Sequence, residues 1–332
     1  MTRSSSTREA ADGTTEASSY DGLVARSPQG SVFATSWWLD AVAPGRWRAH
    51  EVEERADVLC AWPTVVRSTP LGAIHVMPPL TPYLGPVLQP GEGVRRRSRE
   101  IEQVEALLER LGRFAHLEAT CSPAFDYWTP LRWHGFRQTT HYTWRLAHVR
   151  DMDAVFAGLR DNVRREIRKA ERQGLTVEEG RLADYLGLHE ATAARHGRLE
   201  SARANRHALE RIEQAAGPRG ARSILIARDA DGRVHSGAYF VHDERWTYYL
   251  LGGSDPERRT SGAASLVMWR AIERAAERGT GFDFEGSMLR PVERFVRAFG
   301  GVPVPYSLVR ATPSAGFRAA RAARLALRRV RS

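Results

Sequence analysis

The sequence predicts an α/β (α+β) protein with two lobes, each combining helices with a mixed, mainly antiparallel sheet. Its 332 residues exceed the usual size of one compact domain. Apolar runs at 223–228, 237–241 and 246–251 are separated by turn residues, which is typical of an antiparallel meander. We expect four segments: a leader at 1–20, lobes at 21–150 and 151–312, and a tail at 313–332.

The leader and the first lobe differ in composition. Residues 1–20 are mostly small, polar or charged, so we expect them to be disordered. Phe33, Trp37, Trp38 and Leu39 then have the helical spacing of a buried face. Proline fits neither a helix interior nor a central strand. We therefore expect a rigid loop over the proline-dense run 77–86, after a strand at 58–66 and before a helix at 100–116.

The second lobe is predicted to begin with helices and to continue around the meander. Helical patterns cover 151–172 and 182–216, with a short strand after Gly174 between them. Beyond the meander, a loop containing glycine leads into further alternating elements. These are a helix at 263–278, a strand at 281–284, a helix at 291–299 and a strand at 304–310.

Charge and cysteine content exclude several classes of protein. The formal net charge is +10, but six arginines of the tail supply more than half of it. This basic, amphipathic tail could contact a membrane surface or RNA, or form a solvated surface helix. No apolar run approaches the roughly 18 to 20 residues needed to cross a bilayer, and no signal sequence is evident, so we expect a cytoplasmic protein. Cys60 and Cys121 are too few for a disulfide framework or a zinc site, and no metal is expected.

One candidate anion site precedes the helix at 263–278. Arg259, Gly262, Ala263 and Ala264 fit the pattern R-x-x-G-x-A, in which small residues let backbone amides approach a pyrophosphate. The first amides of a helix lack partners within it, and the helix dipole adds partial positive charge there. The alternative is that Gly262 only permits a tight turn.

Two carboxylates follow the next strand. Alternation sets Phe282 and Phe284 on one face and Asp283 and Glu285 on the other. A partly buried carboxylate with a raised pKa can take a proton from an attacking amine, and Glu285 is the preferred candidate. The alternative is structural: Asp283 caps a loop, and Glu285 pairs with one of two nearby arginines, Arg290 or Arg294.

A basic ridge is predicted on the helix at 160–172. Arg164, Arg168 and Arg172 recur at intervals of four, with Arg165 and Lys169 beside them. The ridge could bind an anionic donor, or it could be a solvated helix face, since acidic residues lie among its cations. No G-x-S-x-G, phosphate-loop or H-E-x-x-H motif accompanies it.

Three stretches of the second lobe resemble the Fem-type aminoacyltransferases and the related Fem-like acyltransferases, which have GNAT-like lobes. They are 159–171, ending in I-R-K-A-E; 248–253 with 262–272; and 282–287 with 291–306. In the first lobe, 33–38 and 81–86 are similar to the family's entry helix and substrate-side loop. Two features depart from the family: Arg297 is one position away from a family lysine, and no coiled-coil arm is present.

The resemblance implies two GNAT-like lobes with a cleft between them, and transfer of an acyl group to an amine. We expect the acceptor to lie between Trp38 and Tyr83 on one side and Tyr249 and Glu285 on the other. Further expected substrate-binding residues are Ser287, Arg297 and Tyr306. The donor would contact the segment Arg259, Gly262, Ala263 and Ala264, together with Arg164 and Arg168.

Three functions are compatible with these residues. The first is aminoacyl-tRNA-dependent transfer of an amino acid to an amine of a cell-wall precursor or a natural-product peptide. The second is acyl-CoA-dependent N-acylation, and the third is non-catalytic binding of a nucleic acid or another anion on the same fold. In the first two cases the donor is a co-substrate, and no tightly bound cofactor is expected.

Overall fold

The computed structural model describes residues 19–54, 57–147, 149–286, 288 and 290–330. The chain forms two compact units. Residues 1–18 of the expected leader lie outside the described residues. Unit 1 comprises the chain up to residue 140 and from 306 onward, and unit 2 comprises 141–305. The first lobe was expected to end at 150 and the second at 312. The chain instead leaves unit 1 within one strand and returns to it within another.

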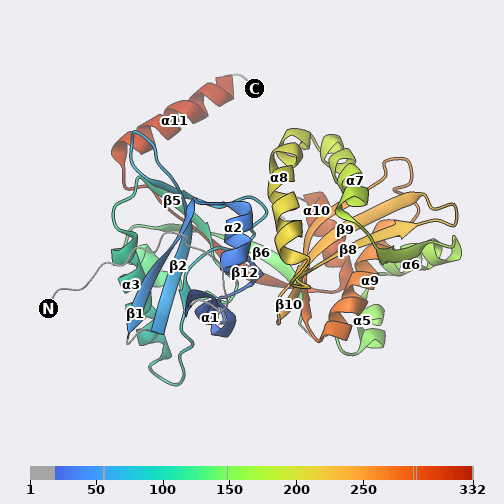
Figure 1. Ribbon diagram of the computed structural model, residues 1–332, viewed down its shortest axis with the longest axis horizontal. Helices are drawn as coiled ribbons and strands as arrows, with labels where there is room; N and C mark the ends of the chain where they lie inside the picture. Colours follow the sequence, from blue (N-terminus) through green and yellow to red (C-terminus); the bar gives the residue numbers. More distant parts are fainter. Residues whose placement is uncertain (1–18, 55–56, 148, 287, 289, 331–332) are drawn as a thin grey trace. The chain divides into compact units, whose positions relative to one another are not determined.

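Unit 1 contains a sheet with helices packed on it (Figure 1). Its elements are α1 (Ser19–Arg26), the 3₁₀ helix η1 (Val32–Ala34), α2 (Ser36–Val42), β1 (Trp47–Glu54), β2 (Asp57–Arg67), β3 (Ile74–Val76), β4 (Val87–Leu88), α3 (Arg96–Leu111), β5 (His116–Thr120), α4 (Thr129–Trp133), the first residues of β6 (Arg137–Leu146), the last residues of β12 (Val302–Ala311) and α11 (Ala315–Val330).

The sheet of unit 1 has the order β1-β2-β3-β5-β12, with β4 beside β2. Among these described pairs, β3 and β5 are parallel and the others are antiparallel. Helix α3 buries Val104, Leu107 and Leu111 against the sheet, in a core that includes Trp62 and Val309. The last strand of the chain thus completes the core of unit 1.

Unit 2 also combines one sheet with helices. Its elements are the rest of β6, α5 (Met152–Gly158), α6 (Asp161–Arg172), β7 (Thr176–Glu179), α7 (Leu182–Arg195), α8 (Leu199–Ala216), β8 (Arg222–Arg228), β9 (Val234–His242), β10 (Trp246–Ser254), α9 (Ala263–Arg278), β11 (Gly281–Asp283), α10 (Arg290–Val296), the 3₁₀ helix η2 (Arg297–Phe299) and the start of β12.

The sheet of unit 2 has the order β6-β11-β10-β9-β8-β7. Among the described pairs, only β10 and β11 are parallel. Side chains alternate across the strands, so Leu225 and Phe240 pack with α9, whereas Tyr239 lies beside Tyr185 of α7. Helices α9 and α7 therefore cover opposite faces of this sheet (Figure 1). The predicted fold class is confirmed: each unit is a mixed, mainly antiparallel sheet flanked by helices.

Several element boundaries differ from the predicted ones. Helix α1 includes the last two residues of the expected leader and buries Tyr20. The predicted helix at 100–116 is wrong at its end, because α3 stops before Gly112 and His116 already belongs to β5. The predicted helical region at 151–172 is interrupted at Leu159, whose extended backbone separates α5 from α6.

Candidate active site

Strands β10 and β11 are paired over a short distance and then part. Their parallel register covers Trp246 with Gly281, Thr247 with Phe282, and Tyr248 with Asp283. Strand β10 continues to Ser254 on its other partner, β9, with a bulge between Tyr249 and Leu251. In the described chain, the edge of β10 beyond Tyr248 is not paired with β11. Backbone amides at such a parted edge can bind a ligand, although the Ser254 N–H at its end already donates to the Thr192 hydroxyl at 2.9 Å.

Glu285 stands just after β11, where the strands part. Its backbone is left-handed, with φ of 55°, which is uncommon for a residue that is not glycine. Its N–H donates a hydrogen bond of 2.8 Å to Oδ1 of Asp283 two residues earlier. The side chain of Asp283 therefore stabilises a backbone conformation that glutamate rarely adopts.

Asp283 is fully buried and has several partners. Besides the Glu285 N–H, it accepts hydrogen bonds from the Thr143 hydroxyl at 2.5 Å and from Arg145 Nε at 2.8 Å. The Arg145 guanidinium also lies over the Trp246 ring, 4.2 Å from its centroid. Because its charge is balanced and its oxygens are engaged, Asp283 is suited to positioning rather than to proton transfer.

Glu285 has the opposite environment. Its Oε1 is buried and has no hydrogen-bond partner among the described residues. Burial, with a further contribution from the negative charge of Asp283, raises the pKa of Glu285 well above its usual value. No ion pair joins it to Arg290 or Arg294 in the described chain, although the sequence left such a pair open. Its carboxyl group can therefore exchange a proton at a pH closer to neutral than an ordinary glutamate can.

Tyr249 lies on β10 near this carboxyl group. Burial and the charge of Glu285 raise the pKa of Tyr249 to about 12, so its hydroxyl stays protonated and can donate a hydrogen bond. A Cβ atom on Gly252 would lie 1.9 Å from the Tyr249 hydroxyl oxygen. The glycine thus leaves room for this hydroxyl beside the free edge of β10.

The helix start at Gly262 has the geometry expected from the sequence, with φ of 84°. The space beside Gly262 is filled, because a Cβ atom there would lie 2.2 Å from the carbonyl oxygen of Glu166 in α6. Lys169 Nζ donates to the Thr260 carbonyl oxygen at 2.5 Å and holds α6 against the same loop. Arg259 is exposed, Ala263 is buried and Ala264 is half-buried. Packing of α6 therefore explains the glycine, without a pyrophosphate.

The expected substrate-binding residues of unit 1 belong to a buried aromatic cluster. The rings of Tyr83 and Tyr306 meet edge to face at 5.2 Å between centroids, and Phe33 contacts both Tyr83 and Trp38. The indole of Trp38 donates to the Thr81 hydroxyl at 3.0 Å. Trp38, Tyr83 and Tyr306 are thus brought together, but as part of the core of unit 1.

Two further expected residues are not part of this arrangement. Arg297 lies in η2 and pairs with Glu293, with 2.9 Å between Nε and Oε1. Ser287 lies outside the described residues. In the tail, α11 is helical as expected, and its start is attached to unit 1 because Phe317 stacks on His116 with centroids 5.2 Å apart. No described helix has the length and apolar character needed to cross a membrane.

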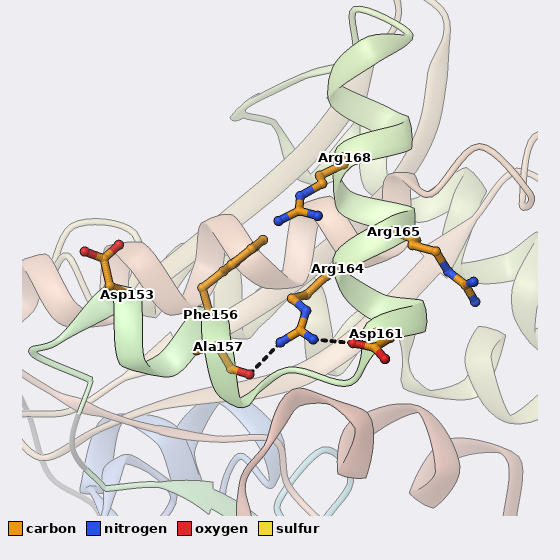
Figure 2. A pocket seen from close by; sticks show the side chains of 7 residues that line it. All are labelled: Asp153, Phe156, Ala157, Asp161, Arg164, Arg165 and Arg168. Carbon is orange, nitrogen blue, oxygen red and sulfur yellow. Dashed lines mark hydrogen bonds and ion pairs between the residues drawn. The ribbon is translucent and has the colours of Figure 1, made fainter.

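Arg164 and Arg168 lie at a pocket of unit 2 (Figure 2). The pocket lies between α5 and α6 and has a volume of about 560 Å³. The two expected donor-binding arginines thus both line this pocket. Gly262 does not line it, and the Glu166 carbonyl oxygen of α6 packs against this glycine.

Sequence reasoning missed Thr143 and Arg145, which hold Asp283 from β6. The two residues alternate onto one face of that strand, but no motif marks them. Their pairing with Asp283 arises from the sheet register, in which Arg145 is opposite Asp283.

The comparisons with known proteins agree with this geometry. Residues 157–295 match the family model described as an acetyltransferase (GNAT) domain. The sequence matches no curated protein. The fold is similar to a structure of FemX, with a TM-score of 0.67 and 14% identity, over 89% of this chain and 96% of that chain.

Two other solved structures are similar. One is the C-terminal domain of a putative lysylphosphatidylglycerol synthetase from Agrobacterium fabrum, with a TM-score of 0.55 and 13% identity, over 88% of this chain and 90% of that chain. The other is a conserved protein of unknown function from Bacteroides thetaiotaomicron, with a TM-score of 0.57 and 11% identity, over 89% and 97%. Residues 157–295 thus form a GNAT acetyltransferase domain by sequence, and the chain has a fold similar to that of FemX.

Proposed function

We propose that this acyltransferase moves an aminoacyl group from aminoacyl-tRNA to an amine of a cell-wall precursor or natural-product peptide, with Glu285 as the general base. The observation that carries the proposal is the buried, unpartnered Oε1 of Glu285 beside the parted strands β10 and β11. A protein rarely leaves a buried carboxyl oxygen without a partner unless a substrate supplies one.

The reaction follows from these groups. The acceptor amine attacks the ester carbonyl carbon of the donor, and a C–N bond forms as the nitrogen loses a proton to the Glu285 carboxylate. Backbone amides on the free edge of β10 donate hydrogen bonds to the resulting oxyanion. The C–O bond to the ribose then breaks, and Glu285 returns its proton to the ribose oxygen.

The choice of an aminoacyl donor rests on the similar structures. FemX has the highest TM-score of the three structures named above. The Agrobacterium protein is named as a putative lysylphosphatidylglycerol synthetase, and lysyl is an aminoacyl group. The proposal implies a cytoplasmic location, because aminoacyl-tRNA is a cytoplasmic molecule.

Acyl-CoA is the second candidate donor, favoured by the match to an acetyltransferase (GNAT) domain. In that case a C–S bond breaks and the proton from the amine leaves with the thiol. The same base and the same strand edge would serve both reactions, so Glu285 does not distinguish them.

The experiment offers the purified protein radiolabelled aminoacyl-tRNAs and acyl-CoAs, and follows donor loss with and without a mixture of amines. The proposal expects loss of one aminoacyl-tRNA, and Glu285→Gln should slow it by about tenfold or more. Glu277→Gln changes an exposed residue of α9 and is the matched control. If only an acyl-CoA is consumed, acyl-CoA is the donor in place of aminoacyl-tRNA. If Glu285→Gln reacts at the wild-type rate, Glu285 is not the general base.

A further inference from the structure

An open pocket lies between α5 and α6. Its volume is about 560 Å³, and it is open to solvent, because most of the residues that line it are exposed. Its lining consists of Asp153, Phe156, Ala157, Asp161, Arg164, Arg165 and Arg168 (Figure 2). It contains three arginines, two acids and one aromatic ring, a composition suited to an anionic ligand with a flat portion.

The two central arginines have different roles. Arg164 donates to the Ala157 carbonyl oxygen at 2.6 Å and pairs with Asp161, so its guanidinium is fixed and its nearest acid is already engaged. Arg168, one turn later, lies over the Phe156 ring, 5.7 Å from its centroid. It has no acidic partner among the described residues. Like charges one turn apart repel, and an anion beside both would remove that cost.

The start of α6 adds to the positive potential. The helix begins at Asp161, which lines the pocket, and its N-cap residue Arg160 makes no side-chain capping bond. The N-cap side chain therefore does not accept a hydrogen bond from the first amides of α6, and the helix dipole places partial positive charge at the same end. Pairing with Arg164 neutralises Asp161, so the acid does not oppose a bound anion there.

Phe156 gives the pocket an aromatic wall. Its ring is half-buried and is held edge to face by Trp269, with 5.0 Å between centroids. Figure 2 shows the Arg168 guanidinium extended toward this ring and the Arg164 guanidinium below it. Nucleotide bases stack on aromatic rings and on guanidinium planes, whereas their phosphates pair with arginine.

We propose that this pocket binds a phosphorylated nucleotide, with its phosphate at Arg164 and Arg168 and its base against Phe156. The inference rests on the proposed function and extends it, because both candidate donors end in such a group. It is the terminal nucleotide of tRNA in one donor and the 3′-phosphoadenosine of coenzyme A in the other.

Helix α6 also supports the loop that precedes α9. The wall that carries Arg164 and Arg168 also supplies the Glu166 carbonyl oxygen that packs on Gly262 and the Lys169 ammonium that bonds Thr260. A nucleotide held by α6 is therefore bound by the helix that supports the loop between β10 and α9.

The test uses two probes: adenosine 3′,5′-bisphosphate and an RNA microhelix ending in CCA. Affinities are measured by calorimetry for the wild type, Arg168→Gln, Arg168→Lys and Arg203→Gln. Arg168→Gln should lower the affinity for the probe that binds by about tenfold. Arg168→Lys should recover part of that loss, because it keeps the charge but not the planar group. Arg203 is exposed on α8 and does not line the pocket, so Arg203→Gln should bind within about twofold of wild type.

The probe that binds identifies the source of the nucleotide. Equal binding by Arg168→Gln and wild type would overturn the inference, as would failure of both probes to bind the wild type. Binding that depends on Arg168 in a protein that consumes neither donor would support the pocket and reject the proposed function. The two ideas therefore fail by different measurements.

Discussion

Oδ1 of Asp283 accepts the backbone N–H of Glu285 at 2.8 Å, so one carboxylate holds the main chain of another. The first is buried beside Arg145 and Thr143, and the second has a buried oxygen without a partner. Two acids separated by a single residue thus receive opposite environments. Because of this difference, Asp283 is suited to positioning the backbone and Glu285 to proton transfer.

The raised pKa of Glu285 predicts the pH dependence of the rate. A general base must be ionised, so kcat/KM should rise with pH through the pKa of Glu285, well above the ordinary value of 4.5. Glu285→Gln should lose about tenfold or more in rate and should lose this acidic limb. A pH–rate profile of both proteins measures it. An acidic limb that survives in Glu285→Gln would assign the proton transfer to another group.

The same group affects stability. Because folding raises its pKa, the folded state holds the proton more tightly than the unfolded state, and stability falls as pH rises from the unfolded pKa through the folded one. Glu285→Gln cannot ionise and should be more stable than wild type at neutral pH, by about 1–2 kcal/mol. Urea unfolding at pH 4 and pH 7 tests this. The advantage should shrink at pH 4, and a variant less stable at pH 7 would contradict the prediction.

Asp283→Asn should destabilise the protein strongly. The change removes the negative charge that the partly buried Arg145 faces, and breaking such a buried ion pair costs about 3–5 kcal/mol. Asp231→Asn breaks the exposed pair with Arg233 and is the control, with an expected cost below about 1 kcal/mol. Thermal unfolding of the two variants measures the difference. Equal melting temperatures would show that the buried pair contributes no more than a surface pair.

Gly262→Ala and Gly279→Ala separate backbone conformation from packing. Both glycines cap α9 and have similar positive φ, of 84° and 73°. A Cβ atom at 262 would clash with the Glu166 carbonyl oxygen at 2.2 Å, whereas a Cβ atom at 279 meets nothing within 4 Å. Gly279→Ala should cost about 1 kcal/mol and Gly262→Ala at least about 2 kcal/mol more. Urea unfolding of both variants tests whether α6 packs on the helix start; equal losses would reject it.

His242 predicts a loss of stability in acid. Burial, with smaller contributions from nearby arginines, lowers its pKa to about 3, and its ring lies 2.9 Å from the Ser223 hydroxyl. The unfolded chain takes up a proton near pH 6.5 and the folded chain does not, so stability should fall as pH drops from 6.5 toward 3. His242→Gln should flatten that part of the curve. His196→Gln, at an exposed position, is the matched control.

The sequence predicted those elements whose ends are marked by local residues. Helix α9 was predicted with its observed bounds, because a glycine stands at each end. The end of α3 was misplaced because apolar residues continue past Gly112 into β5, and spacing alone does not separate the two. In the candidate site, alternation singled out Asp283 and Glu285. Arg145 lies far away in sequence and meets Asp283 only through strand pairing, which no local pattern encodes.

Unit 1 is assembled from two distant parts of the chain, because Leu308 of β12 pairs with Thr120 of β5. During synthesis, residues 121–301, which include most of unit 2, are made after β5 and before β12. Unit 2 can therefore fold first, while the partly made sheet of unit 1 keeps an open edge at β5. The sheet of unit 1 cannot be completed until β12 has been made, so a nascent chain stalled before residue 302 should expose the open edge of β5 to chaperones.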